Sequence, residues 1–351
     1  MSGKLKTAIL GLDEQAMLLL QAASECEYFQ IEAVADKDAL RVEKTAERYN
    51  CTAYDDYRQL IIQNHFDCLL VADAIYNCEE YIKTAMKKKI NILKLSPPAR
   101  NFEEAAELVK LAEEQNIQFA IANQNRFAKS WLKLQQLLNQ KQFRQISIIS
   151  AICTTSNNTP STWQSDPKLA GGGVLLYDCY ETIDLIMANF PLPEQIYSLN
   201  TNHAIDRQQR LYLTEDIAVM SMKFNDVLFG SLIASRAFGP EQKTLKLYGK
   251  ENVIIVSNGK LLLEDKNGRI IEKFNFNDNK ISCMTKLLEN FAISILSPDK
   301  NNLISSAREN LINMATIEAA YLSARTAMPE EPAKILKMEL NQPTNIWPVH
   351  K

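Results

Sequence analysis

The turn after the first apolar run carries the most informative residues for chemistry. Residues 11–16 read Gly-Leu-Asp-Glu-Gln-Ala and precede an apolar helix pattern. A dinucleotide-binding turn uses one glycine for the tight turn, a second for close approach to pyrophosphate and a third for helix packing. Gly11 keeps the turn, Leu12 follows it, and Ala16 is small enough for the third position. Asp13 departs from the pattern, because it adds a negatively charged side chain where pyrophosphate must come close.

Asp13 has two interpretations. The N-terminus of a helix favours an anion, and Asp13 or Glu14 can supply that anion from within the chain. As a helix cap, Asp13 would contribute roughly 0.5–2 kcal/mol to the fold. Two unit charges about 4 Å apart repel by roughly 1–4 kcal/mol, which weakens dinucleotide binding by about ten- to a thousandfold. The sequence therefore predicts impaired or absent pyrophosphate binding.

Asp36 ends the second apolar run, in Val-Ala-Asp-Lys-Asp, with Lys37 directly after it. An acidic residue at this place binds the adenosine ribose hydroxyls of a dinucleotide. The alternative is a helix cap for the segment 39–50. Both interpretations stay open. If a nucleotide binds, Asp36 and Lys37 belong to its site, and NAD is favoured over NADP.

Composition excludes several functions. The 351 residues carry a net charge of -3, and no basic patch is interleaved with aromatic residues, so we expect no nucleic-acid partner. The apolar runs are too short for a membrane span. Seven cysteines without a Cys-x-x-Cys pair, and three scattered histidines, predict free thiols and no metal site. With no signal-peptide pattern at the N-terminus, we expect a cytoplasmic protein.

The first 125 residues alternate between apolar strands and amphipathic helices. Strands wholly apolar in sequence are typical of a parallel sheet covered on both faces. The alternation predicts a doubly wound α/β domain over residues 1–125. The expected strands lie at 6–12, 29–36, 66–73, 90–95 and 117–123.

The pattern changes after residue 125. A helix is expected over 174–190, and β-rich runs with turn residues follow at 217–238 and 253–274. Helices at 282–296 and 305–326 close the chain. The sequence predicts an α+β second domain, 126–351, with a mainly antiparallel open sheet. The helix 305–326 and the tail are expected to pack back on the first domain.

Four segments together resemble the Gfo/Idh/MocA oxidoreductases. They are IEAVADKDALRVEKTAERYN, PPARNFEEAAELVKLAEEQN, GGGVLLYDCYETIDL and IEAAYLSART. The resemblance implies a Rossmann domain and a C-terminal sheet through which members form dimers or tetramers. It also implies hydride transfer between NAD(P) and a sugar-like or polyol-like small molecule.

The resemblance places Asp73 and Ala74 in the cofactor cleft, where the family has Thr-Pro near the nicotinamide ribose. The family's Glu-Lys-Pro motif aligns with residues 95–97. Pro97 is kept, but Ser96 replaces the lysine that in active relatives assists proton transfer and orients the nicotinamide. Lys94 shares the strand face but lies about 6.6 Å further back. It is therefore a candidate partial replacement for that lysine.

Active relatives carry an aspartate and a histidine four residues apart on the helix after the glycine triplet. Here these positions hold Tyr177 and Glu181, so the helical spacing survives without the residue types. Histidine suits proton transfer because its pKa lies near neutral pH, whereas glutamate would need a raised pKa. With Asp178 beside them, Tyr177 or Tyr180 could donate a proton and Glu181 could accept one. The alternative is an amphipathic helix whose polar face lines a vacant cleft.

Other matched positions predict substrate contacts at Arg126, Trp163 and Asp184, together with Asp178. Two hypotheses follow. In the first, the chain is an oxidoreductase-family protein whose activity has diverged or been lost with the catalytic lysine and histidine. In the second, it is a non-catalytic binding or interaction module that no longer binds NAD(P) and pairs with an active relative.

Overall fold

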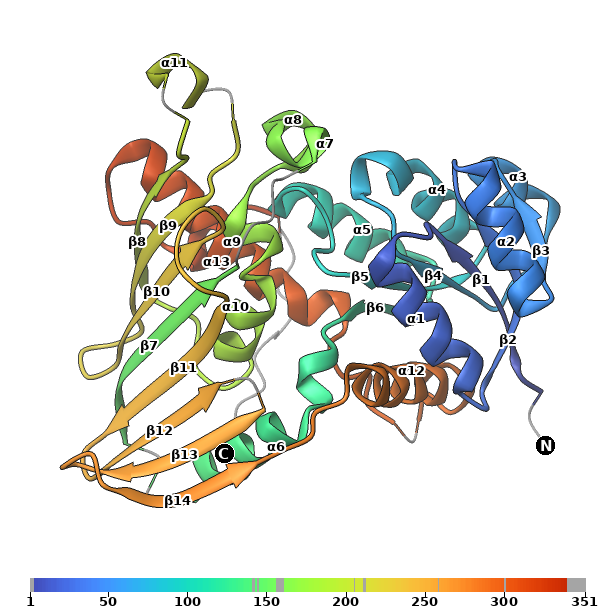
Figure 1. Ribbon diagram of the computed structural model, residues 1–351. Helices are drawn as coiled ribbons and strands as arrows, with labels where there is room; N and C mark the ends of the chain where they lie inside the picture. The colour runs from blue at the N-terminus through green and yellow to red at the C-terminus, as the bar shows by residue number, and fades with distance from the viewer. Residues whose placement is uncertain are drawn as a thin grey trace.

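Two sheets with their helices form the two halves of the molecule. The computed structural model describes residues 3–339 except 141, 142, 144, 156–160, 205, 211, 212, 258 and 300. Figure 1 shows the two halves side by side, with the N-terminal half in blue to cyan and the second sheet in green to orange. The chain beyond residue 339, including the predicted tail contact, lies outside the described residues.

The N-terminal half is a six-stranded parallel sheet in the order β3-β2-β1-β4-β5-β6. The predicted doubly wound parallel sheet is confirmed. The sequence did not predict β3, because a three-residue strand gives no periodicity to detect. The strands are β1 Leu5–Leu10, β2 Phe29–Ala35, β3 Thr52–Tyr54, β4 Cys68–Val71, β5 Asn91–Leu95 and β6 Phe119–Ala122.

Acidic and amide side chains start most helices of this half. Asp13, Asp38, Asp56 and Asn101 each accept a hydrogen bond from a backbone N–H two or three residues further on. Such caps satisfy N–H groups that have no partner inside the helix. They lie near the carboxyl ends of the strands, where ligands bind in open α/β sheets. The helices are α1 Glu14–Glu25, α2 Ala39–Tyr49, α3 Tyr57–Gln63, α4 Ile75–Lys87 and α5 Phe102–Glu114.

The second half is built on an eight-stranded sheet in the order β14-β13-β12-β11-β7-β10-β9-β8. All neighbouring strands are antiparallel except β7 and β10. The predicted mainly antiparallel sheet is confirmed. Its strands are β7 Ile146–Thr154, β8 Gln195–Thr201, β9 Ile217–Lys223, β10 Phe229–Ser235, β11 Gln242–Gly249, β12 Asn252–Ser257, β13 Lys260–Asp265 and β14 Ile270–Asn275.

The predicted helix 174–190 is interrupted. The chain forms α9 Val174–Tyr177 and α10 Tyr180–Met187, with Asp178 and Cys179 between them. The other helical segments of this half are η1 Gln124–Phe127, α6 Lys129–Leu138, α7 Thr162–Ser165, α8 Pro167–Ala170, α11 Arg207–Arg210, α12 Lys280–Leu296, α13 Ala307–Thr326 and α14 Pro332–Glu339.

Two C-terminal helices join the halves. Helix α12 packs on α1, and its residues Leu288 and Phe291 belong to the core on that face of the parallel sheet. Helix α13 packs between α5 and β8. Just before α13, Ser306 pairs with Ala120 at the edge of β6. None of the helices in the described part of the chain has the length and apolar character needed to span a bilayer.

Candidate functional site

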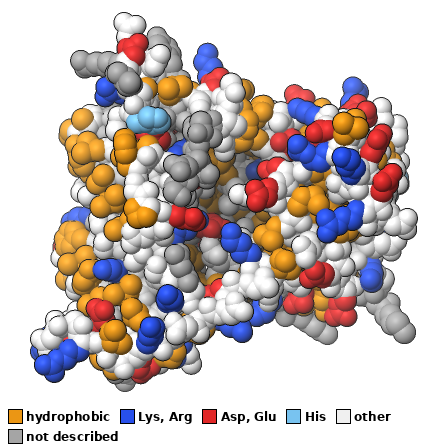
Figure 2. All heavy atoms as spheres, viewed as in Figure 1, with side chains coloured by type: hydrophobic (Ala, Val, Ile, Leu, Met, Phe, Trp, Pro, Cys, Tyr) orange, Lys and Arg blue, Asp and Glu red, His pale blue; other side chains and the backbone are white. Residues whose placement is uncertain are grey.

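A cavity of about 1100 Å³ lies between the two sheets. The carboxyl ends of β4, β5 and β6 form one wall, and residues of α9, α10 and β11 form the opposite wall. Acidic and basic side chains lie along the boundary between the two halves in Figure 2. The position matches the crevice at which open α/β sheets bind ligands.

Gly11 is explained by the packing of the fold. Its φ of +88° lies in the left-handed region, and an added Cβ would lie 2.6 Å from the Asp73 backbone nitrogen. Only glycine fits so close to the turn after β4. Gly11 would therefore be required even in a chain that binds no nucleotide, and its retention says nothing about pyrophosphate.

Asp13 occupies the anion site at the start of α1. Its Oδ1 accepts the Ala16 backbone N–H at 2.8 Å, and the side chain lines the cavity. Burial raises the pKa of the Asp13 carboxyl, and the negative charges of Asp73 and Asp36 raise it further. The turn therefore already holds a carboxylate of its own, with two more carboxylates near enough to repel it.

The Asp36 side chain also contacts the turn between β1 and α1. Its Oδ2 accepts the Leu12 backbone N–H at 2.7 Å, and its Oδ1 accepts the Asp38 backbone N–H at 2.8 Å. Each oxygen that would bind ribose hydroxyls thus has a backbone donor. Lys37 extends to Asn77, where its Nζ donates to Oδ1 at 2.7 Å.

Asp73 is bound to its own half of the molecule. It accepts the Tyr57 hydroxyl at 2.8 Å and the Ala74 backbone N–H at 2.7 Å. Burial, together with the Asp73 charge, raises the pKa of Tyr57. Asp73 and Ala74 both line the cavity, so the structure brings them together with Asp13.

Lys94 lies at the end of β5 and is almost fully buried. Its Nζ donates to the carbonyl oxygens of Leu95 at 3.0 Å and Pro97 at 2.8 Å. Burial lowers the pKa of the Lys94 amine, although Cys78 and Asp73 act in the opposite direction. Ser96 and Pro97 also line the cavity, so all three residues of this strand end are in the site.

Glu181 is held by residues from other elements. Its Oε2 accepts the Asn125 amide at 2.7 Å and lies 3.6 Å from the Lys243 Nζ. Burial would lower the pKa of Lys243, but Glu181 and other neighbours raise it above its usual value. The other oxygen, Oε1, has no hydrogen-bond partner in the described part of the chain. One carboxylate oxygen is therefore held by two neighbours, and the other has no hydrogen-bond partner among the described residues.

Asp178 and Tyr177, which are close to Glu181 in the sequence, already have hydrogen-bond partners. Arg236 donates to Asp178 Oδ2 from Nε at 2.9 Å and also from Nη2, and both residues line the cavity. The Tyr177 hydroxyl donates to the Ala170 carbonyl at 2.7 Å, and burial raises its pKa. A phenol with a raised pKa that already donates is poorly placed to transfer a proton.

Trp163 joins the two halves at the cavity wall. Its ring lies 5.4 Å from Tyr76 at the start of α4 and 5.6 Å from Tyr177, centroid to centroid. These separations are typical of favourable aromatic pairs. The tryptophan therefore has a packing role as well as a place in the cavity.

Comparison with known proteins assigns the family. The model of the oxidoreductase family's NAD-binding Rossmann fold, Gfo/Idh/MocA, matches residues 5–124. The model of the same family's C-terminal alpha/beta domain matches residues 136–332. The chain belongs to the Gfo/Idh/MocA oxidoreductase family.

Individual relatives of this family member are distant in sequence. The uncharacterized protein YMR315W of Saccharomyces cerevisiae is 23% identical over 314 residues, which are 82% of this chain and 84% of that protein. Levoglucosan dehydrogenase, solved with NADH and levoglucosan, is 15% identical with a TM-score of 0.84, covering 93% of this chain and 99% of that one. The WlbA dehydrogenase of Bordetella pertussis, solved with NADH and UDP-GlcNAcA, is 16% identical with a TM-score of 0.79, covering 93% and 98%.

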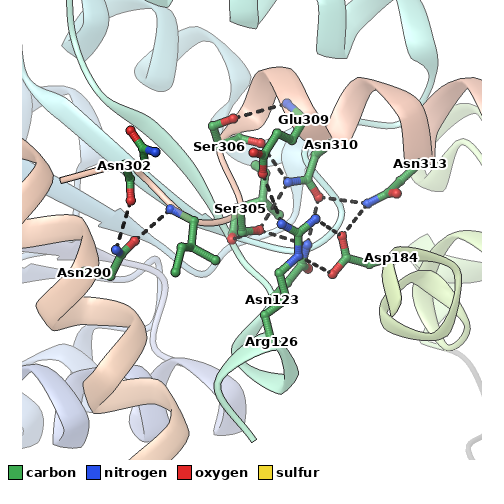
Figure 3. Close-up of polar contacts among 12 residues, drawn as sticks. Asn123, Arg126, Asp184, Asn290, Asn302, Ser305, Ser306, Glu309, Asn310 and Asn313 are labelled. Carbon is green, nitrogen blue, oxygen red and sulfur yellow. Dashed lines mark hydrogen bonds and ion pairs between the residues drawn. The ribbon is translucent and has the colours of Figure 1, made fainter. Parts of the chain in front are cut away.

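In this Gfo/Idh/MocA protein, Arg126 and Asp184 face each other outside the cavity lining. Arg126 donates to the two Asp184 oxygens from Nε at 2.8 Å and from Nη2 at 2.7 Å, and to Glu309 from Nη1 at 3.0 Å. Asn313 donates to Asp184 as well, at 2.8 Å. Figure 3 shows this network joining η1, α10 and the start of α13. Both residues were predicted as substrate contacts, and the structure instead places them in a network that joins η1, α10 and α13.

The glycine triplet has a similar explanation. A Cβ at Gly172 would overlap the Tyr321 hydroxyl, and one at Gly173 would overlap the backbone of Glu215. The buried Glu215 carboxylate accepts the Gly173 and Leu175 N–H groups at 2.8 and 3.0 Å and the Tyr321 hydroxyl at 2.9 Å. The triplet thus allows α9 to start against α13.

Several cavity residues were not predicted from the sequence. Asn125, Arg236 and Lys243 contact the predicted carboxylates, yet each lies more than 50 residues from its partner. The one available signal was a charged residue at the end of an apolar strand, as with Arg236. Among the described residues, no group of three or more histidine, cysteine, aspartate or glutamate side chains could hold a metal ion.

Proposed function

We propose that this Gfo/Idh/MocA protein binds a polar, sugar-sized small molecule in the cavity between its sheets and no longer carries out NAD(P)-dependent hydride transfer. The observation that carries the proposal is the Asp13 carboxylate, which caps α1 through the Ala16 N–H at 2.8 Å. In dinucleotide-binding domains this helix terminus receives the pyrophosphate.

The charges around the cavity support the proposal. The carboxylates outnumber the basic side chains, so a pyrophosphate with two negative charges would meet net repulsion. In the described part of the chain, the cavity is lined by the carboxylates of Asp13, Asp73, Asp178, Glu181, Glu241 and Asp278 and by the basic groups of Lys94, Arg236, Lys243 and Lys280.

The catalytic positions also favour loss of the ancestral reaction. Ser96 stands where active relatives have lysine, and a hydroxyl is a poor acid at neutral pH. Glu181 stands where they have histidine, and Asn125 and Lys243 hold one of its oxygens.

The cavity still offers polar groups to a small ligand. Glu181 and Trp163 line the wall, and Glu181 Oε1 has no hydrogen-bond partner among the described residues. Gln124 and Trp131 line the cavity too, and each buries a polar side-chain atom with no partner among the described residues. The structural relatives bound to levoglucosan and to UDP-GlcNAcA support a ligand rich in hydroxyl groups.

The test is a calorimetric titration of the native protein with NADH and with NADPH. The proposal predicts a dissociation constant weaker than about 1 mM for both. Saturable binding in the micromolar range would contradict it. A parallel thermal-shift screen with sugars, polyols and sugar acids would then identify the ligand, because a ligand that binds the folded state raises its melting temperature.

A second candidate is hydride transfer with Lys94 in place of the missing lysine. The observation in its favour is that Lys94 Nζ lies 2.8 Å from the carbonyl oxygen of Pro97, which belongs to the segment 95–97 that aligns with the family's Glu-Lys-Pro motif. In that case NAD would be favoured over NADP, because Asp36 disfavours a ribose phosphate. NADH oxidation with a panel of ketoses, lost in Lys94→Met, would support this candidate, whereas no turnover with any ketose would exclude it.

We also propose that the chain forms a homo-oligomer through the open face of the second sheet. Leu199, Val219 and Ile233 form one exposed cross-strand row, since Leu199 pairs with Val219 and Val219 pairs with Ile233. Phe229 and Ile148 form a second exposed pair. Contiguous apolar patches of this kind mark interaction surfaces.

The proposed location is the cytoplasm. All seven cysteines are free thiols, and six of them are buried. Unpaired cysteines in this number fit a reducing compartment. Fractionation of the source cells with an antibody to the chain would test the location, and recovery outside the cytoplasm would contradict it.

A further inference from the structure

Lys94 is a buried amine at the cavity wall, and it has no carboxylate partner among the described residues. It is 3% exposed and lines the cavity. Within the part of the chain that the structure describes, no carboxylate lies within ion-pair distance of its Nζ, and its acceptors are the carbonyls of Leu95 and Pro97. Buried charges in proteins are normally paired.

Two carbonyl acceptors match the hydrogen-bonding capacity of a neutral amine. An ammonium group has three N–H donors, and one of them would be left without an acceptor here. A neutral amine has two N–H donors and a lone pair. Burial lowers the pKa of Lys94, which also favours the neutral amine, although Cys78 and Asp73 act in the opposite direction. The geometry and the burial therefore agree on an amine with an available lone pair.

We propose that Lys94 forms a reversible imine with a small aldehyde or ketone, such as an open-chain sugar, that enters the cavity. The Nζ lone pair adds to the carbonyl carbon, and the carbon–oxygen π bond becomes a hydroxyl group in the carbinolamine. Loss of water then leaves a carbon–nitrogen double bond. Both hydrogens of that water come from the amine, so no oxidant, reductant or metal is required. Buried lysines with lowered pKa values serve as such nucleophiles.

Lys243 provides the contrast within the same cavity. It also lines the wall, but its Nζ lies 3.6 Å from Glu181 and its neighbours raise its pKa, so it stays protonated. Lys280, at the start of α12, is exposed. Each unit by which a lysine pKa falls increases its neutral fraction at pH 7 roughly tenfold. Of these three amines, Lys94 is the one expected to react.

The experiment uses the full native chain at pH 7 without nucleotide. The protein is incubated with glyceraldehyde and cyanoborohydride, which reduces an imine to a stable secondary amine, and the modified lysines are mapped by mass spectrometry. We expect Lys94 to be modified at least about tenfold faster than Lys243, Lys280 and the surface lysines. The Lys94→Met variant should lose this fast-reacting site, and Lys243→Met should keep it.

Modification of Lys94 at or below the rate of the surface lysines would overturn the proposal. So would an unchanged fast phase in Lys94→Met. The first result needs no variant, so it holds even if the substitution disturbs the strand end. The proposal rests on the proposed small-molecule site, but its outcome does not depend on NADH. A chain that binds NADH tightly can still form the imine, and one that binds no nucleotide can fail to form it.

Discussion

Replacing Asp184 with asparagine should unfold the protein at a lower temperature because it breaks a buried ion pair. The side chain is 1% exposed and accepts three hydrogen bonds, two from Arg126 and one from Asn313. Asparagine keeps the shape and one accepting oxygen, but its NH2 group presents hydrogens to the donors on the other side and it carries no charge. The change therefore leaves the Arg126 guanidinium buried without its main counter-charge.

The size of the effect follows from these contacts. Breaking a buried ion pair by removing one partner costs about 3–5 kcal/mol. Arg126 keeps a second acceptor in Glu309, which is half exposed, so we expect the lower end, about 3 kcal/mol. For a chain of 351 residues that unfolds as one unit, each kcal/mol shifts the melting temperature by about 1.4 °C, so the expected fall is about 4 °C.

Differential scanning calorimetry of the native protein and of Asp184→Asn measures this fall. Glu309→Gln is the matched control, because it removes the exposed partner of the same arginine and should cost less than about 1 kcal/mol. A melting temperature within a degree of the native value for Asp184→Asn would refute the structural role. A selective loss of ligand affinity with unchanged stability would instead restore Asp184 as a substrate contact.

Three further predictions concern stability, charge and assembly. Glu215→Gln should lose about 1–3 kcal/mol in urea unfolding, because all three groups that Glu215 contacts are donors and the NH2 group that replaces one oxygen cannot accept from them; an unchanged midpoint would refute this. The pKa of Asp13 is raised above 3.8, so stability from this group is present in acid and is lost as the pH rises through that pKa. Asp13→Asn, which still caps the helix, should therefore melt at or above the native temperature at pH 7, with a smaller difference at pH 4; lower stability at pH 7 would contradict it. Ile233→Lys should convert an oligomer to monomers in size-exclusion chromatography with light scattering, and a native protein that is already monomeric would contradict the proposed sheet interface.

Local features of the fold were predictable from the sequence. The apolar strands of the parallel sheet and the cap formed by Asp13 depend on neighbours a few residues away, since the N–H that Asp13 accepts belongs to Ala16. The short strand Thr52–Tyr54 and the break between α9 and α10 were not predicted. The first has too few residues for a periodic pattern, and the second lies inside a segment whose apolar residues keep a helical spacing on both sides of the break.

The site was less predictable because its contacts are distant in sequence. Asp178 meets Arg236 across 58 residues, and Glu181 meets Asn125 across 56. Many of the residues that the resemblance implied for the site line the cavity, but the resemblance could not show which of their oxygens already have donors. Arg126 illustrates the limit, because nothing in the sequence distinguishes a substrate contact from an ion pair between η1 and α10.

The affinity for NADH of the native protein and of Asp13→Asn, measured side by side by calorimetry at pH 7, shows whether the Asp13 carboxylate blocks dinucleotide binding. The substitution keeps the cap and removes the charge at the anion site. We predict a native dissociation constant weaker than about 1 mM and binding about ten- to a thousandfold tighter in Asp13→Asn. Micromolar binding by the native protein, unchanged by the substitution, would contradict the account.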